Sequence, residues 1–173
     1  MSEPITRPEW DVYHMRKARV AAERGSCARL QVGAVIIDGD SNRLLADGYN
    51  GSLPGDPHCL DAGCLMVDGH CVRTIHAELN AFGKLFFTGT HCKNLVLYTT
   101  AFPCWRCAQQ TILQGVKRIV YSDAYRTDEL VVQACMRHKV ELVQVQVIAP
   151  VWPDRPPSQA APFSRPLHVA AQE

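Results

Sequence analysis

A histidine and a glutamate stand two residues apart in the segment "TIHAELNA", as His76 and Glu78. Further along, the segment "FPCWRCA" places Cys104 and Cys107 three residues apart, directly after a proline. Proline favours the first turn of a helix, and residues i and i+3 share one helix face, so both sulfurs can reach the same point. A helix N-terminus also stabilises thiolates, the form in which cysteine binds a metal. The two segments therefore predict a zinc site with the ligands His76, Cys104 and Cys107.

Three protein ligands leave the fourth tetrahedral position of zinc to water, as in catalytic rather than structural sites. Zinc lowers the pKa of bound water toward neutrality. Glu78 is close enough to His76 in the chain to lie beside that water, so we expect it to transfer protons and not to bind the metal. His-x-Glu followed by Pro-Cys-x-x-Cys is the signature of zinc nucleobase deaminases. Either half alone is common: a lone His-x-Glu is usually a capping or surface feature, and a lone Cys-x-x-Cys is often structural or redox-active.

The composition restricts the other possible functions. The chain has 173 residues, 47% of them hydrophobic and 20% charged, which suits one globular domain with a full core. Its 18 Lys and Arg against 17 Asp and Glu give a formal charge of +1, with no basic run that would neutralise a phosphate polymer. The polar N-terminal segment does not resemble a signal peptide, and no stretch has the roughly 18 apolar residues of a membrane span. We expect a soluble cytoplasmic protein whose partners include neither a nucleic-acid polymer nor a membrane.

The hydrophobic pattern predicts the elements that must position these residues. We expect helices at about residues 8–24, 75–86, from 103, and 130–138, and strands at 32–37, 43–49, 95–100, 118–122 and 141–148. The first two strands should form a hairpin, and the strand–helix–strand order after them implies right-handed crossovers between parallel strands. In "ELVQVQVI" valines alternate with glutamines, which is typical of an edge strand with one wet face. The order predicts an α/β fold in which helices cover a mixed, largely parallel sheet of about five strands.

Two stretches fall outside this pattern. Residues 50–73 lack any period and are rich in Gly, Asp, Pro, Cys and His, and a loop of this length in a compact domain usually has a function or a staple. Residues 149–173 contain six of the 11 prolines, so we expect an extended or disordered tail that adds no chemistry. The chain therefore divides into a zinc-dependent domain at residues 1–148 and a proline-rich tail at 149–173.

The chain resembles the cytidine and deoxycytidylate deaminase family over about residues 8–148, and within it the deoxycytidylate (dCMP) deaminases. The resemblance rests on "VGAVI", "GYNGS", "HAELNA", "TTAFPCWRCA" and "QGVKRIVYSDAY". It implies a three-layer α/β/α cytidine-deaminase-like fold and hydrolytic deamination of dCMP to dUMP with release of ammonia, which supplies dUMP for dTMP synthesis. Glu78 would protonate N3 of cytosine and then the departing amine. Members of the family are commonly homo-oligomers, often hexamers, and many are activated by dCTP and inhibited by dTTP.

The resemblance also implies a set of substrate contacts. Asn50 of "GYNG" is expected to bind the deoxyribose or the base, and the backbone N–H of Ala77 to bind the base carbonyl. Asn50 could instead be only a left-handed turn residue. The segments "CARLQVGA", "HCVRTIHAE" and "DAYRTD" resemble those that surround the phosphate, and Arg suits a phosphomonoester best. The expected phosphate ligands are Arg29 and Arg126 first, and then His70 and Tyr125.

Further cysteines precede the catalytic segments: Cys27, Cys59, Cys64 and Cys71. A loop with few apolar residues cannot hold itself by burial, and a metal would fix it. Some dCMP deaminases that this chain resembles have a second, structural zinc with a ligand at the position of Cys27, so we assign the four cysteines to a closed tetrahedral site. His70 could replace Cys71 as the fourth ligand, and unpaired cysteines without a metal are the alternative. We expect Cys92 and Cys135 to be small, buried apolar residues.

Two rival functions use the same residues. The first is an enzyme of the same fold that acts on free cytidine or another cytosine nucleotide, a tRNA adenosine, guanine or a riboflavin precursor. The missing basic run argues against tRNA, and the Arg-bearing segments favour a mononucleotide over a nucleoside. The second is a zinc-stabilised binding module without catalysis, which would lack a glutamate at position 78.

Overall fold

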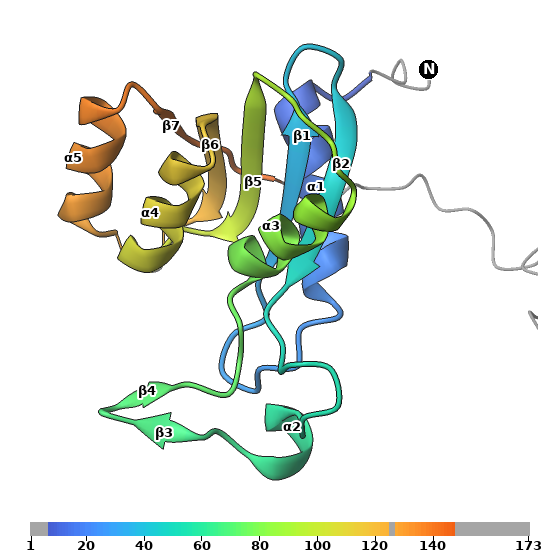
Figure 1. Ribbon diagram of the computed structural model, residues 1–173, viewed down its shortest axis with the longest axis vertical. Helices are drawn as coiled ribbons and strands as arrows, with labels where there is room; N and C mark the ends of the chain where they lie inside the picture. The colour runs from blue at the N-terminus through green and yellow to red at the C-terminus, as the bar shows by residue number, and fades with distance from the viewer. Residues whose placement is uncertain (1–6, 125–126, 148–173) are drawn as a thin grey trace, which may run out of the picture.

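The computed structural model describes residues 7–124 and 127–147. They form a five-stranded sheet with the strand order β2-β1-β5-β6-β7. Its strands are β1 (Gly33–Asp38), β2 (Arg43–Tyr49), β5 (Leu95–Ala101), β6 (Val116–Asp123) and β7 (Glu141–Gln144). The helices that cover the sheet are α1 (Trp10–Ala22), α3 (Ala77–Phe87), α4 (Trp105–Leu113) and α5 (Glu129–Arg137) (Figure 1).

The sheet is mixed and largely parallel, as the sequence predicted, because β2, β5, β6 and β7 run in the same direction and β1 runs against them. β1 pairs antiparallel with both β2 and β5, whereas β5 with β6 and β6 with β7 are parallel pairs. The crossover from β2 through α3 to β5 joins two strands that point the same way, as expected for a strand–helix–strand unit. However, β1 lies between those two strands and runs in the opposite direction, because it is the other half of the β1–β2 hairpin.

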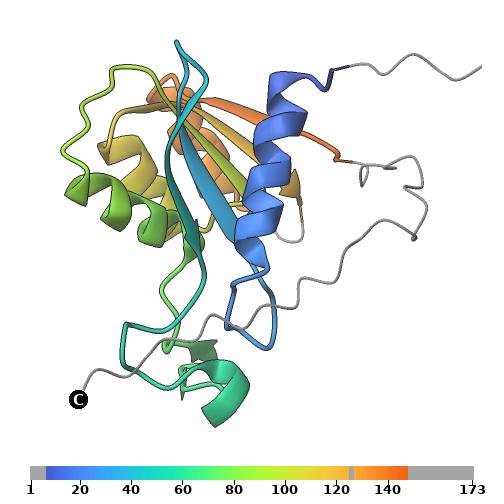
Figure 2. The same cartoon turned by 90° about the vertical axis from the view of Figure 1, so that its right-hand side faces the viewer.

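Helices cover both faces of the sheet. Alternate residues of β1 belong to two separate cores: Val35 packs with Met15 of α1, and Ile36 packs with Ala81 of α3. Figure 2 shows α1 alone on one face, with α3, α4 and α5 on the opposite face. The predicted three-layer α/β/α architecture is therefore confirmed.

Four strand ends meet at one edge of the sheet, called the site edge below. β5 and β6 both end there, with Ala101 opposite Asp123. β1 begins there, with Gly33 opposite Tyr49 at the end of β2. α4 follows β5 directly and so begins at this edge. In open α/β sheets, ligands bind outside the carboxyl ends of the strands, which makes this edge the expected place for a site.

Residues 50–73 form a lobe that projects beyond the site edge (Figure 1). The lobe contains α2 (Cys59–Ala62) and a hairpin of β3 (Met66–Val67) and β4 (His70–Cys71). The sequence predicted only a loop, because elements this short carry no hydrophobic period. At the base of the lobe, the N–H of Gly51 donates to Ile75 (3.2 Å) and the N–H of Ile75 donates to Gly51 (2.8 Å). Because Ile75 directly precedes His76, this bridge brings the start of α3 to the site edge.

Most other elements appear within a few residues of their predicted bounds. β7 is an edge strand, as expected, although it ends at Gln144. Cys135 is buried, as expected. Cys92 packs against the core but is only half-buried, and its thiol also donates a hydrogen bond to Asp38 (3.3 Å), so its expected burial is only partial. The tail predicted at residues 149–173 lies outside the described residues. No described helix has the length and apolar character needed to cross a bilayer.

β2 approaches α3 very closely at Gly48. A Cβ atom at this position would lie 2.3 Å from the carbonyl oxygen of Ala77 and 2.4 Å from the backbone nitrogen of Ala81. Both atoms belong to the backbone of α3, so neither can rotate out of the way. Glycine at position 48 therefore lets the first turn of α3 lie directly against the sheet.

We expect Gly48→Ala to lower the free energy of unfolding by about 1–3 kcal/mol, the usual cost of overpacking. Gly83→Ala is a matched control within α3, because no atom lies within 4 Å of a Cβ at position 83. Alanine there should be neutral or should stabilise the protein by up to about 1 kcal/mol. Urea denaturation measures both effects. Equal stability of the two variants would show that the approach of β2 to α3 tolerates a side chain.

Candidate active site

The three predicted zinc ligands converge at the N-termini of two helices. His76 is the N-cap residue of α3 and Cys104 is the N-cap residue of α4, and neither side chain caps its helix. Both are instead free to point toward a common centre. Nδ1 of His76 lies 3.4 Å from Sγ of Cys104 and 3.3 Å from Sγ of Cys107. The predicted spacing therefore brings one nitrogen and two sulfurs together.

These distances fit a zinc ion. Zinc binds sulfur at about 2.3 Å and imidazole nitrogen at about 2.0–2.1 Å, which separates the two ligand atoms by roughly 3.5 Å at a tetrahedral angle. The observed separations of 3.3 and 3.4 Å are slightly shorter. The ring atom that faces both sulfurs is Nδ1, so this nitrogen, and not Nε2, is the one placed to bind a metal.

The electrostatics of the two cysteines also suit a cation. Hydrogen bonds from Cys107 and then His76 lower the pKa of Cys104 to about 3, although burial opposes this. The same hydrogen bond with Cys104, together with burial and the nearby Glu78, raises the pKa of Cys107. The pKa values of the two thiols are thus shifted in opposite directions, because the hydrogen bond between them favours the thiolate of Cys104 and the thiol of Cys107. A divalent cation at this point would favour the thiolate form of both sulfurs.

Glu78 lies in the first turn of α3 and is almost fully buried, with 4% of its surface exposed. Burial raises the pKa of its carboxyl group, and the charge of His76 partly opposes this effect. A carboxyl group whose pKa is moved toward neutrality can both accept and return a proton at physiological pH. These properties suit a general acid and base, and this role of Glu78 stays a prediction.

Asn50 holds the backbone that borders the site edge. Its Oδ1 accepts a hydrogen bond from the N–H of Val32 (2.8 Å), and its Nδ2 donates to the carbonyl of Leu30 (2.7 Å). Asn50 is not among the described residues with positive φ, so the alternative that it is a left-handed turn residue is wrong. Ala77 is fully buried at the first position of α3, where a backbone N–H has no partner within the helix. Substrate contacts by Asn50 and Ala77 stay predictions.

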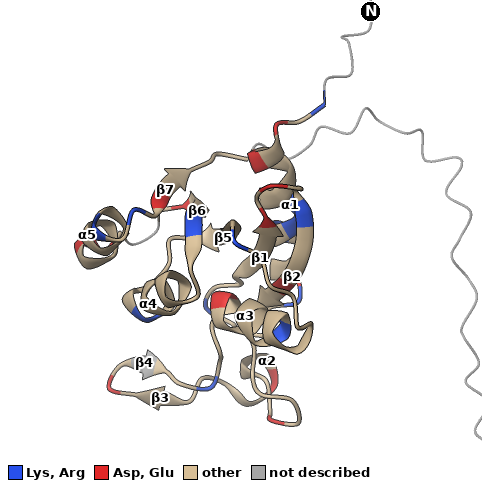
Figure 3. Cartoon of the chain, turned by 45° about the horizontal axis from the view of Figure 1, so that its top comes forward, with Lys and Arg blue, Asp and Glu red and all other residues tan. Residues whose placement is uncertain are grey.

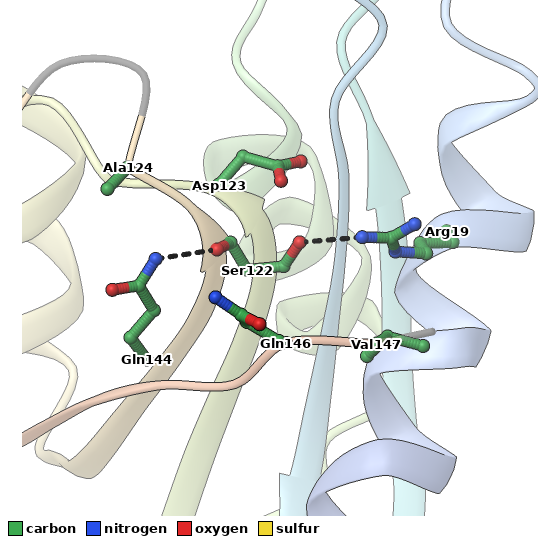
Figure 4. Close-up of a pocket in the computed structure, with 7 residues that line it drawn as sticks. All are labelled: Arg19, Ser122, Asp123, Ala124, Gln144, Gln146 and Val147. Atoms are coloured by element: carbon green, nitrogen blue, oxygen red, sulfur yellow. Dashed lines mark hydrogen bonds between the residues drawn. The ribbon is translucent and has the colours of Figure 1, made fainter. Parts of the chain in front are cut away.

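The residues predicted to bind phosphate are only partly described. Arg29 is exposed in the segment between α1 and β1. Tyr125, Arg126 and the side chain of His70 lie outside the described residues. The sequence analysis missed Arg19 of α1, which borders two cavities near the site edge and donates a hydrogen bond to Oγ of Ser122 (2.9 Å) (Figure 4). Arg19 belongs to no recognisable motif, and the sequence alone does not distinguish it from the other basic residues of α1.

Three of the four cysteines predicted for a second metal site come together in the lobe. The sulfurs of Cys59, Cys64 and Cys71 all lie within 4.8 Å of one another, and those of Cys59 and Cys71 are 3.7 Å apart. Two sulfurs bound to one tetrahedral zinc are about 3.8 Å apart. Cys27 is half-buried ahead of β1 and does not belong to this group of described residues. The lobe therefore brings together three sulfurs that could hold a metal ion, whereas the second zinc and its fourth ligand stay predictions.

Charged residues of both signs are spread over the molecule. Figure 3 shows acidic and basic residues on each of α1, α3 and α5. A protein that binds long nucleic acids usually gathers its basic residues on one face. On α1, α3 and α5, by contrast, the two signs are mixed.

Comparisons with known proteins agree with this geometry. The family described as the cytidine and deoxycytidylate deaminase zinc-binding region matches residues 8–123. The ComE operon protein 2 of Bacillus subtilis is 38% identical over 143 residues, which cover 83% of this chain and 75% of that protein. The deoxycytidylate deaminase of Saccharomyces cerevisiae is 37% identical over 134 residues, which cover 73% of this chain and 41% of the yeast protein.

A solved structure extends the comparison to three dimensions. The dCMP deaminase of cyanophage S-TIM5, in complex with dCMP and dUMP, matches with a TM-score of 0.69 and 26% identity. The match covers 82% of this chain and all of the phage chain, 100%. Fold, ligand geometry and comparisons together define a zinc-binding deaminase domain. The chain belongs to the cytidine and deoxycytidylate deaminase family.

Replacing both sulfurs should remove the metal at the site edge. We expect a Cys104→Ser, Cys107→Ser double variant to contain about one zinc per chain less than the wild-type protein, because a lone histidine binds zinc weakly. Elemental analysis of gently purified protein measures this. Cys135→Ser changes a buried cysteine of α5 away from the ligands and should leave the zinc content unchanged. Equal zinc contents of the double variant and the wild-type protein would contradict the ligand assignment.

Proposed function

We propose that this protein hydrolyses dCMP to dUMP and ammonia. The observation that carries the proposal is the meeting of His76 Nδ1 with two cysteine sulfurs beside the buried carboxyl group of Glu78. A relative at 37% identity is named deoxycytidylate deaminase, and the phage structure with the same fold contains dCMP and dUMP. The reaction would supply dUMP for dTMP synthesis.

The chain provides each group that the reaction needs. Zinc bound by His76, Cys104 and Cys107 would supply an activated water for addition to C4 of cytosine. Glu78 would take one proton from that water and deliver it to N3 while the water oxygen bonds to C4. It would then carry the second proton of that oxygen to the amino group, which leaves as ammonia when the C4–N bond breaks and C4=O forms. Because burial stabilises its neutral form, the Glu78 carboxyl group holds the proton between these two transfers. The free N–H of Ala77 would bind the base carbonyl, and Asn50 shapes the segment that faces the substrate.

The rival functions fit less well. A binding module without catalysis has no use for a buried carboxyl group beside the metal ligands, yet Glu78 is present. A deaminase for another cytosine nucleoside or nucleotide is the alternative with the same chemistry.

By resemblance to the family, we also propose a cytoplasmic homo-oligomer such as a hexamer, with regulation by dCTP and dTTP. Phe86 and Phe87 at the end of α3 are 82% and 89% exposed, which supports association between chains.

An ammonia-release assay with dCMP, dCTP, deoxycytidine and cytidine tests both the reaction and the substrate. We expect the wild-type protein to prefer dCMP, and we expect Glu78→Gln to keep its zinc but lose about 10²- to 10⁴-fold in turnover, the usual contribution of a general acid or base. Glu129→Gln is the control, because Glu129 occupies the first turn of α5 and is exposed. Normal turnover by Glu78→Gln would remove this residue from the mechanism, and a preference for deoxycytidine would refute the substrate assignment.

We further propose that Cys59, Cys64 and Cys71 hold a second zinc that stabilises the lobe. The distance of 3.7 Å between the sulfurs of Cys59 and Cys71 supports this. The lobe also lacks an apolar core of its own, because Leu60, Met66 and Val67 are all about half-exposed or more, at 61%, 48% and 48%. We propose Cys27 as the fourth ligand, with His70 as the alternative ligand. In both cases the metal would join the two halves of the lobe.

Cys59→Ser should lower both the zinc content and the melting temperature, because the lobe has no apolar core of its own that could replace the lost cross-link. Cys92→Ser is the control, since Cys92 lies outside the cluster. Comparing zinc contents of Cys27→Ser and His70→Ala identifies the fourth ligand. One zinc per chain in wild-type protein, with no loss of zinc in Cys59→Ser, would exclude the second site.

A further inference from the structure

The residues of α3 that carry chemistry lie at the start of the helix, where helices fray most easily. His76 is the N-cap residue and Glu78 lies in the first turn, whose backbone N–H groups have no partners within the helix. The side chain of His76 makes no capping hydrogen bond, so the usual stabilisation of a helix start is missing. A metal ligand and a general acid or base nevertheless need fixed positions. The first turn of α3 is therefore expected to be held by contacts from outside the helix.

Asn80 supplies such a contact. Its Nδ2 donates a hydrogen bond to the backbone carbonyl of Tyr49 at the end of β2 (2.8 Å). Its backbone N–H donates to the carbonyl of His76 (3.0 Å). Asn80 thus closes the first turn of α3 with its backbone and ties that turn to the sheet with its side chain. Helix propensity favours alanine over asparagine at such a position, so the tie to β2 gives the asparagine its physical reason.

The carbonyl of Tyr49 is available because β2 is an edge strand of the sheet. In an antiparallel pair, the N–H and C=O groups of successive residues point alternately toward the partner strand and away from it. Asn50 donates its N–H to the carbonyl of Val32, just before β1, so the backbone groups of Tyr49 point to the open side of β2. Asn80 therefore satisfies a strand-edge carbonyl that β1 does not reach.

A second tie lies on the other side of the reacting residues. The backbone bridge between Gly51 and Ile75 holds the residue before His76, and the bond from Asn80 to Tyr49 holds the residue at the end of the first turn. Residues 76–78 lie between these two points. Both ties use the same short segment, residues 49–51, so this segment fixes the start of α3 from both sides.

A third contact between α3 and β2 is weaker. Lys84 lies one turn beyond Asn80, and its Nζ is 3.4 Å from a carboxylate oxygen of Asp47, with 45% and 52% of the two side chains exposed. Exposed ion pairs of this kind contribute little to stability. The bond from Asn80 is shorter and partly buried, so it is the more specific connection between α3 and β2.

We propose that Asn80 is a positioning residue for the reaction. Its bond to Tyr49 holds the first turn of α3, and with it Nδ1 of His76 and the carboxyl group of Glu78, in register with the sulfurs on α4. Asn80 acts through these residues and is not itself a catalytic residue. The expected effect on turnover rests on the proposed deamination of dCMP, whereas the effect on the helix start does not.

Asn80→Ala and Asn80→Asp test the assignment in turnover. Alanine removes the donor while it favours the helix, and aspartate keeps the shape but turns an acceptor toward the carbonyl of Tyr49. We expect kcat for dCMP to fall about tenfold to a hundredfold in both variants, the usual effect of small misplacements, with a smaller change in KM. Asn80→Gln keeps the amide donor and should recover part of the loss. Lys84→Ala is the matched control on the same side of α3 and should leave kcat unchanged.

Two further readouts do not depend on turnover. Amide hydrogen exchange of the zinc-loaded protein should become faster in residues 76–81 of Asn80→Ala, with α4 and α5 unchanged. Cobalt(II) in place of zinc absorbs visible light according to its ligand geometry, so its spectrum should change in Asn80→Ala and not in Lys84→Ala. Either result stands even where wild-type protein does not deaminate dCMP, which would refute the reaction alone.

The assignment is overturned by normal kcat in both Asn80→Ala and Asn80→Asp, or by an equal loss in Lys84→Ala. Faster exchange throughout the chain in Asn80→Ala overturns it as well, because Asn80 would then stabilise the fold as a whole and not the start of α3.

Discussion

The structure depends on one constraint: the N-termini of α3 and α4 must meet at the same edge of the sheet. Two contacts and one chain connection establish this meeting. Gly48 lets the first turn of α3 lie against β2, the Gly51–Ile75 bridge brings the residue before His76 to the edge, and α4 starts there because it follows β5 directly. The side chains at both helix starts are free of capping bonds, so they can face each other. The candidate metal site lies between these two helix starts.

Different side chains reach the site edge from the two faces of the sheet. Helices on one face bring the metal ligands and Glu78, and α1 on the other face brings Arg19 to the ends of the same strands. β1 makes this division possible, because its alternate residues pack against α1 on one side and α3 on the other.

The sequence predicts local features better than distant contacts. His76, Cys104 and Cys107 could be predicted as ligands because each belongs to a short motif at the start of a helix. Cys104 and Cys107 also lie within one helical turn of each other, and the structure brings all three side chains together. Asn50 was recognised, but its bonds to Leu30 and Val32 cross between distant segments and leave no trace in a linear pattern. The position of β1 between β2 and β5 was missed for the same reason, and so was Arg19, whose environment is formed by α1, β6 and β7. In the lobe, the number of cysteines in a short segment was enough to predict that they cluster. The position of Cys27 relative to this cluster depends on tertiary packing and could not be predicted.

Anomalous diffraction above and below the zinc absorption edge, from crystals of the wild-type protein grown with dUMP, tests the central claim most directly. The account predicts one zinc peak at the start of α3 and α4, about 2.0–2.1 Å from Nδ1 of His76 and about 2.3 Å from the sulfurs of Cys104 and Cys107, with Glu78 outside the coordination sphere. A peak bound through Nε2 of His76 or through the carboxylate of Glu78, or no peak between the two helix starts, would contradict it.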